Sequence, residues 1–130
     1  MIPNVKIAVV DSHKLIRDLA VDVLAFSVNR KVFSFDEGFE LWDYLRSNDS
    51  ADLIVIDNEL PDISGIDLLF KIKKTFPKKI CILMSSDIAK EQKALECKAD
   101  AFLAKPFTVN DLFDIVQKFV VEIDWKPFQK

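Results

Sequence analysis

The chain has 130 residues, of which 50% are hydrophobic and 30% are charged. This composition is rich enough in apolar residues for the core of one domain, and it excludes an intrinsically disordered protein. A formal net charge of −3 provides no basic surface for a nucleic acid, so we expect no direct nucleic acid binding by this chain.

Membrane and secretory segments are not predicted. No apolar run approaches the ~20 residues that a membrane span requires. The amino terminus has no charged region ahead of its short apolar run, which is not typical of a signal peptide. Cys81 and Cys97 have neither metal-binding nor redox spacing, so we expect buried or half-buried free thiols in a reducing cytoplasm. The sequence therefore predicts a cytoplasmic location.

Five short apolar runs are typical of β-strands. In chain order they are VKIAVV (5–10), KVFSF (31–35), DLIVI (52–56), KICILM (79–84) and AFLA (101–104). The stretches IAVV and LIVI are continuously apolar rather than alternating. Continuous runs of this kind are typical of strands that helices cover on both faces of a parallel sheet.

Each predicted strand is followed by a segment with helical periodicity. The apolar positions expected to face the core are Leu15, Ile16, Leu19, Ala20, Val23 and Leu24; Phe39, Trp42 and Leu45; Ile66, Leu69, Ile72 and Phe76; Ile88, Ala94, Leu95 and Cys97; and Leu112, Ile115, Val116, Phe119 and Val120. The fourth segment, residues 87–97, has the weakest pattern. Five strands that alternate with five helices predict an α/β fold with right-handed crossovers.

Polar side chains follow four of these strands. They are Asp11 and Ser12 after the first, Asp57 after the third, Ser85 and Ser86 after the fourth, and Lys105 after the fifth. Ligands of open α/β sheets bind beyond the carboxyl ends of the strands. Two close carboxylates repel each other unless a cation lies between them, and such oxygen ligands suit Mg²⁺. A carboxylate beside a metal ion and an ammonium group suits phosphoryl transfer.

These residues resemble the motifs of a known family. Asp11, Asp57 with Pro61 and Gly65 downstream, Ser85, and the Lys105-Pro106 pair are similar to the receiver domain of two-component response regulators. The resemblance implies a flavodoxin-like, doubly wound (βα)5 three-layer sandwich with a parallel five-stranded sheet of order 2-1-3-4-5. It places a receiver domain at residues 1–121, and a C-terminal tail or the start of a linker at residues 122–130.

The resemblance also implies roles for single residues. Asp57 matches the aspartate that accepts the phosphoryl group, and Lys105 matches the lysine that pairs with its oxygens. Ser85 matches the hydroxyl that bonds the phosphoryl group, and Phe102 matches the aromatic switch position. The implied Mg²⁺ site comprises Asp11, Ser12, Asp57 and the main-chain carbonyl of Glu59.

Two positions depart from the family pattern. Ser12 stands where a second acid usually ligates Mg²⁺ directly, so we expect weaker Mg²⁺ binding than in a Ser12→Asp variant. A rotated Asp11, a water held by Ser12, or the side chain of Glu59 would each compensate. Lys98 stands where glycine often ends the fourth helix. Either it adopts a left-handed conformation at some cost, or the turn is built differently, or it is simply a cation that suits a helix C-terminus. We favour the last interpretation.

His13 follows the first strand's polar residues directly. We interpret it as a loop or helix-start residue without a chemical role.

Three function classes remain open. The first is a switch that accepts a phosphoryl group on Asp57 from a histidine kinase or phosphotransfer protein with Mg²⁺, and that catalyses only its own phosphorylation and dephosphorylation. A homodimer or an output partner would then use the face of the fourth helix, fifth strand and fifth helix. The second is a pseudo-receiver that binds proteins without phosphorylation, which Ser12 would favour. The third is an aspartyl-phosphate phosphatase, because Asp57-Asn58-Glu59 resembles the nucleophile motif of that class.

Overall fold

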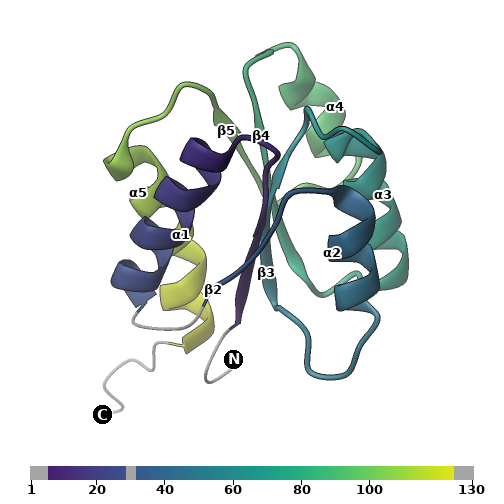
Figure 1. The fold of residues 1–130 in the computed structure, drawn as a ribbon, viewed down its shortest axis with the longest axis horizontal. Coiled ribbons are helices and arrows are strands. Elements are labelled where there is room, and N and C mark those ends of the chain that lie inside the picture. The colour runs from purple at the N-terminus through teal and green to yellow at the C-terminus, as the bar shows by residue number, and fades with distance from the viewer. Residues whose placement is uncertain (1–5, 29–31, 125–130) are drawn as a thin grey trace.

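The computed structural model describes residues 6–28 and 32–124 (Figure 1). Strands and helices alternate along them: β1 (Ile7–Val10), α1 (Lys14–Val28), β2 (Val32–Phe35), α2 (Gly38–Leu45), β3 (Leu53–Asp57), α3 (Gly65–Thr75), β4 (Ile80–Ser85), α4 (Lys90–Glu96), β5 (Ala101–Ala104) and α5 (Val109–Asp124). The strands form a parallel sheet of order β2-β1-β3-β4-β5, which confirms the predicted fold class. Val5 and Lys31 of the predicted strands, and residues 125–130 of the predicted tail, lie outside the described residues.

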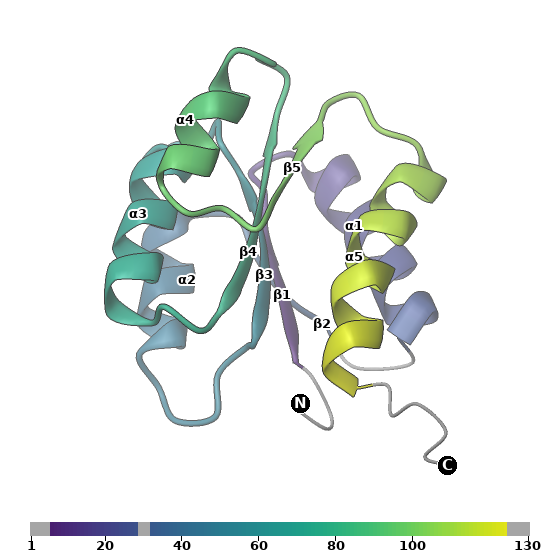
Figure 2. The same ribbon diagram turned by 180° about the vertical axis from the view of Figure 1, so that it is seen from behind.

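The sheet separates two hydrophobic cores. Helices α1 and α5 cover one face, and α2, α3 and α4 cover the other (Figures 1 and 2). Alternate side chains of one strand enter different cores: Ile54 and Ile56 of β3 pack on the α2–α3–α4 side, whereas Leu53 and Val55 pack on the α1–α5 side. A strand that is buried on both faces needs an apolar residue at each position, which explains the continuous runs in the sequence.

The register of the sheet decides where the polar residues emerge. Val10 of β1 pairs with Ile56 of β3, and Asp57 pairs with Met84 of β4. Ser85 pairs with Ala104 of β5. Because the strands are parallel, the residues that follow them all lie at one edge of the sheet.

Several predicted core positions of α1 and α2 are wrong. Leu15 is 83% exposed and Leu19 is 38% exposed, whereas Ala20 and Leu24 are fully buried. At 3.6 residues per turn, Leu15 lies about 180° around the helix from Leu24, so the apolar stripe in the sequence is wider than the buried one. Phe39 of α2 is also exposed, because the apolar stripe of that helix is likewise wider than its buried part.

Helix α4 is weakly anchored, as its sequence predicted. Ala94 is its buried residue. Leu95 is 46% exposed, and Ile88, which precedes the helix, is 69% exposed. Both were predicted core positions, and the structure corrects that prediction.

The thiols match their prediction. Cys81 is buried in β4, Cys97 is half-buried after α4, and both are free. Burial raises the pKa of the Cys81 thiol to about 12. Among the described residues, no helix combines the length and apolar character needed to cross a membrane.

Lys98 ends α4 in a left-handed conformation, with φ of 75°. The N–H of Ala99 donates to the carbonyl of Ala94 at 3.0 Å, and the N–H of Lys98 donates to that of Leu95 at 3.0 Å. This pair of bonds is a Schellman motif, in which the left-handed position is usually glycine. Our favoured interpretation of Lys98 was therefore wrong: it adopts the conformation that glycine would.

We expect Lys98→Gly to increase the free energy of unfolding by about 0.5–1 kcal/mol, because glycine has no Cβ to strain the left-handed backbone. Urea unfolding at neutral pH measures the change. Lys93→Gly, at an exposed position inside α4, is the matched control and should instead destabilise by about 1 kcal/mol. A loss of stability in Lys98→Gly would contradict the assignment.

Asp62 caps a helix that is distant in the sequence. Its carboxylate accepts hydrogen bonds from the N–H of Gly38 at 2.9 Å and of Phe39 at 2.8 Å. Glu37, at the N-cap position of α2, makes no such side-chain bond. Partial burial acts to raise the pKa of Asp62, but these main-chain donors and the N–H of Ile63 outweigh it and lower that pKa. The β3–α3 loop is thereby fastened to α2.

We expect Asp62→Ala to lower the free energy of unfolding by about 0.5–2 kcal/mol at neutral pH, the usual effect of losing a helix cap. Because the pKa is lower in the folded protein, the charged carboxylate stabilises the fold above the ordinary aspartate pKa. That stabilisation is lost as the pH falls through the folded value. Urea unfolding at neutral and acidic pH should show that the difference in free energy of unfolding between the unmodified chain and Asp62→Asn becomes smaller in acid. Asp22→Asn, in the exposed middle of α1, is the control, and an equal pH dependence there would contradict the capping role.

Candidate functional site

Lys105 joins two buried carboxylates at the edge of the sheet. Its Nζ lies 2.9 Å from Oδ2 of Asp11 and 3.0 Å from Oδ1 of Asp57. Both aspartates are fully buried, and the lysine side chain is 12% exposed. The structure thus brings together three of the residues that the sequence placed after β1, β3 and β5. The peptide bond between Lys105 and Pro106 is cis.

Charge and burial act against each other within this group. Burial, and secondly the charge of Asp11, raise the pKa of Asp57, while Lys105 acts in the opposite direction. Burial acts to lower the pKa of Lys105, but its bonds to Asp11 and Asp57 outweigh burial and raise that pKa. Removing one partner of such a buried pair typically costs about 3–5 kcal/mol. The three groups are therefore interdependent.

A tight turn carries the chain away from Asp57. The main-chain N–H of Asn58 donates to the main-chain carbonyl of Met84. The side-chain Oδ1 of Asn58 accepts from the N–H of Ile66. A Cβ on Gly65 would lie 2.4 Å from the carbonyl oxygen of Asp57, far inside van der Waals contact. Helix α3 can therefore begin this close to the site only with glycine, which agrees with the turn predicted from the sequence.

Ser85 is fully buried at the end of β4. Its hydroxyl donates to Oε2 of Glu59 at 2.9 Å and accepts from the N–H of Asp87 at 3.0 Å. The same Glu59 oxygen accepts from the side chain of Asn58 at 3.0 Å. The Glu59 carboxylate is thus turned toward Ser85, which disfavours the alternative in which it replaces the missing acid at position 12.

Two further predicted residues lie around this group. The hydroxyl of Ser12 donates to the main-chain carbonyl of Glu59 at 3.4 Å, so these two predicted metal-site residues are neighbours. Phe102 of β5 is half-buried and packs against the core on the α2–α3–α4 side.

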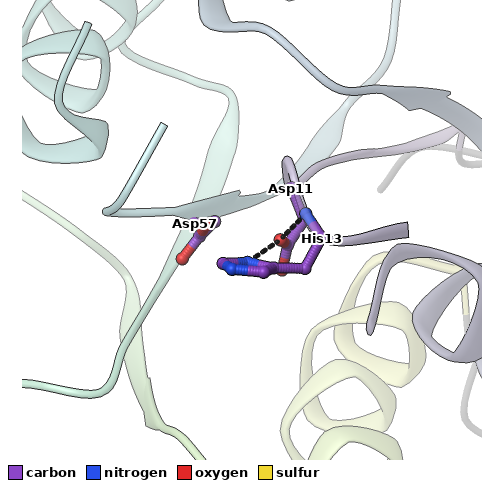
Figure 3. Close-up of side chains that lie close together, drawn as sticks. All are labelled: Asp11, His13 and Asp57. Atoms are coloured by element: carbon purple, nitrogen blue, oxygen red, sulfur yellow. Dashed lines mark hydrogen bonds and ion pairs between the residues drawn. The ribbon is translucent and has the colours of Figure 1, made fainter. Parts of the chain in front are cut away.

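His13, which the sequence analysis interpreted as a loop or helix-start residue without a chemical role, lies directly before α1 and beside Asp11. Its main-chain N–H donates to Oδ1 of Asp11 at 2.9 Å, and its ring Nδ1 lies 3.3 Å from the same oxygen. Figure 3 shows the ring extending past Asp11 toward Asp57. An aspartate that bonds the N–H two residues onward forms an Asx turn, so the Asp-x-His spacing was the available signal.

The donor atoms fit a divalent cation. One ligand atom each from Asp11, His13 and Asp57 lie within 4.8 Å of one another. Oδ2 of Asp57 is buried and has no hydrogen-bond partner. A buried carboxylate oxygen without a partner is costly, and two carboxylates beside one ammonium keep an excess of negative charge. A cation bound here would satisfy both conditions.

The comparisons with known proteins agree with this arrangement. A family model described as the response regulator receiver domain matches residues 7–117. The putative two-component response regulator ARR21 of Arabidopsis thaliana is 31% identical over 114 residues, which cover 88% of this chain and 19% of that protein. The chain thus spans about a fifth of the length of the first curated relatives that it matches.

Solved structures show the same fold. The BeF3-activated receiver domain of DrrB, a protein of Thermotoga maritima, is 33% identical with a TM-score of 0.76, covering 88% of this chain and 96% of that one. A CheY-like receiver domain protein of Methanospirillum hungatei is 26% identical with a TM-score of 0.82, covering 91% and 94%. The chain therefore belongs to the response regulator receiver domain family of two-component systems.

Proposed function

We propose that this receiver domain is a phosphorylation-activated switch whose phosphoryl acceptor is Asp57. One observation carries the proposal: Asp57 is buried at the end of β3, with Lys105 on one carboxylate oxygen and no partner on the other. The free Oδ2 can act as a nucleophile while Lys105 holds the carboxylate in place. The residue roles implied by the family resemblance belong to this proposal.

The proposed reaction moves one phosphoryl group. Oδ2 of Asp57 forms a bond to phosphorus as the bond from phosphorus to a phosphohistidine nitrogen of a histidine kinase or phosphotransfer protein breaks, and the leaving imidazole takes up a proton. Lys105 then pairs with a phosphoryl oxygen. Mg²⁺, when bound by Asp11 and Asp57 with the oxygens of Ser12 and Glu59, supplies charge neutralisation for the phosphoryl oxygens.

The proposed readout starts at Ser85. Its hydroxyl would leave Glu59 and donate to a phosphoryl oxygen, pulling on the start of the β4–α4 loop. Helix α4 can move in response, because Ala94 is the one residue of the helix that is buried. Phe102, on the neighbouring strand, would change its packing with this movement. Such a shift biases a pre-existing equilibrium between two arrangements.

The surfaces on either side of the site suit partners. Leu15 and Leu19 of α1 are exposed, and Leu19 lines a pocket of about 210 Å³ that Lys105 and Phe107 also line. This apolar surface beside Lys105 supports docking of the phosphodonor. Leu95 of α4 and Phe113 of α5 are exposed, which supports a homodimer or an output partner that binds these elements.

The experiment is incubation of the chain with Mg²⁺ and acetyl phosphate, followed by intact mass and peptide mapping. We expect one phosphoryl adduct, on Asp57, that is absent in Asp57→Asn. Asp11→Asn should form the adduct more slowly, since it removes a metal ligand but no nucleophile. No adduct with acetyl phosphate, and no binding of beryllofluoride, would overturn the proposal in favour of a pseudo-receiver.

We expect Glu59→Ala to bind beryllofluoride, a mimic of the phosphoryl group, about 3- to 10-fold more tightly. The variant loses the carboxylate that holds the Ser85 hydroxyl, and a part-buried hydrogen bond of this kind is worth about 1 kcal/mol. Calorimetric titration in Mg²⁺ measures the affinity. Glu91→Ala, which removes the same charge from α4, is the matched control. Unchanged or weaker binding in Glu59→Ala would show that Glu59 does not restrain Ser85.

A further inference from the structure

The cation side of the site differs from an all-oxygen Mg²⁺ site in one donor. Lys105 occupies Oδ2 of Asp11 and Oδ1 of Asp57. The carboxylate oxygens left for a cation are Oδ1 of Asp11, which faces His13, and the unpartnered Oδ2 of Asp57. Ser12 adds no charge, because its side chain is a neutral hydroxyl, which donates to the carbonyl of Glu59.

The His13 ring is held where a third donor is needed. The Asx turn fixes its main chain to Asp11 through the 2.9 Å hydrogen bond. Its side chain is 65% exposed, so a metal ion reaches the ring from solvent without rearrangement of the core. Figure 3 shows the imidazole beside both carboxylates, and a nitrogen of the ring belongs to the set of ligand atoms within 4.8 Å of one another.

Ligand chemistry then decides which ion fits. Mg²⁺ binds carboxylates, phosphates and water in octahedral geometry and is seldom held by imidazole. Imidazole is a good ligand of first-row transition metals, whose affinity rises from Mn²⁺ to Co²⁺ and beyond. Serine in place of an acid at position 12 weakens the binding of Mg²⁺. An imidazole at position 13 strengthens the binding of first-row transition-metal ions.

We propose that His13 is a direct ligand of the cation at this site and shifts its preference from Mg²⁺ toward imidazole-binding divalent ions such as Mn²⁺ and Co²⁺. The proposal concerns the same site as the phosphoryl switch and names the ion that supports it. It would add one neutral nitrogen donor to the two carboxylates, Asp11 and Asp57, that would hold the cation.

Metal titration without a phosphodonor tests the proposal. Calorimetry gives the dissociation constants for Mg²⁺, Mn²⁺ and Co²⁺ in the untagged chain, in His13→Gln and in Ser12→Asp. We expect His13→Gln to weaken Co²⁺ binding by at least about 10- to 100-fold, the range for losing an outer-shell partner of a metal ligand, and to change Mg²⁺ binding less than about twofold. Ser12→Asp should strengthen Mg²⁺ binding, and Asp57→Asn should abolish tight Co²⁺ binding. Equal losses for Mg²⁺ and Co²⁺ in His13→Gln would overturn the proposal.

A spectroscopic readout is independent of any variant. The chain has one histidine, so direct ligation of Co²⁺ produces a single strongly shifted imidazole N–H resonance in the proton NMR spectrum. That signal should be absent with Mg²⁺. Its absence with Co²⁺ at saturation would overturn the proposal. Adduct formation at Asp57 is measured separately, so failure of the His13 assignment leaves the phosphoryl switch intact, and the reverse also holds.

Discussion

Lys105 places a positive charge between two carboxylates that would otherwise repel each other inside the protein. Its Nζ contacts Asp11 and Asp57 at about hydrogen-bonding distance, and all three groups are largely removed from water. This contact ties the end of β5, an edge strand, to the ends of two inner strands, β1 and β3. It requires the parallel register of the sheet, because a shift of one residue would send each side chain to the opposite face. The geometry of the edge thus depends on this ion pair, and the ion pair depends on the sheet.

The fold was predictable because each buried strand has an unambiguous pattern. Continuous apolar runs such as Leu53–Ile56 identified strands covered on both sides, and the order of the polar residues after them predicted one shared edge. Helix faces were less predictable. Leu15 and Leu41 are equally apolar, yet Leu15 is exposed and Leu41 is fully buried. Sequence periodicity gives the width of an apolar stripe, whereas the neighbouring sheet decides which part of it is covered.

The site was predictable in its residues and less so in its contacts. Asp11, Asp57 and Lys105 were predicted from their positions at strand ends and from the family resemblance. The position of His13 beside Asp11 was not predicted, because it depends on an Asx turn, which is a local main-chain bond rather than an apolar pattern. Lys98 was misjudged because its side chain suits a helix C-terminus, while its backbone conformation is imposed by the Schellman bonds. In both cases a main-chain hydrogen bond outweighed what the side chain alone would indicate.

The fastening of the β3–α3 loop makes the two sides of the site unequal in stiffness. Asn58 bonds this loop to β4 and α3, and Asp62 bonds it to the start of α2. The β4–α4 loop, by contrast, meets the site through the hydroxyl of Ser85, and α4 beyond it rests on Ala94. A force applied at Asp57 therefore meets a rigid support on one side and a compliant one on the other. If Asp57 accepts a phosphoryl group as proposed, the resulting displacement would therefore be directed toward α4 rather than toward α2.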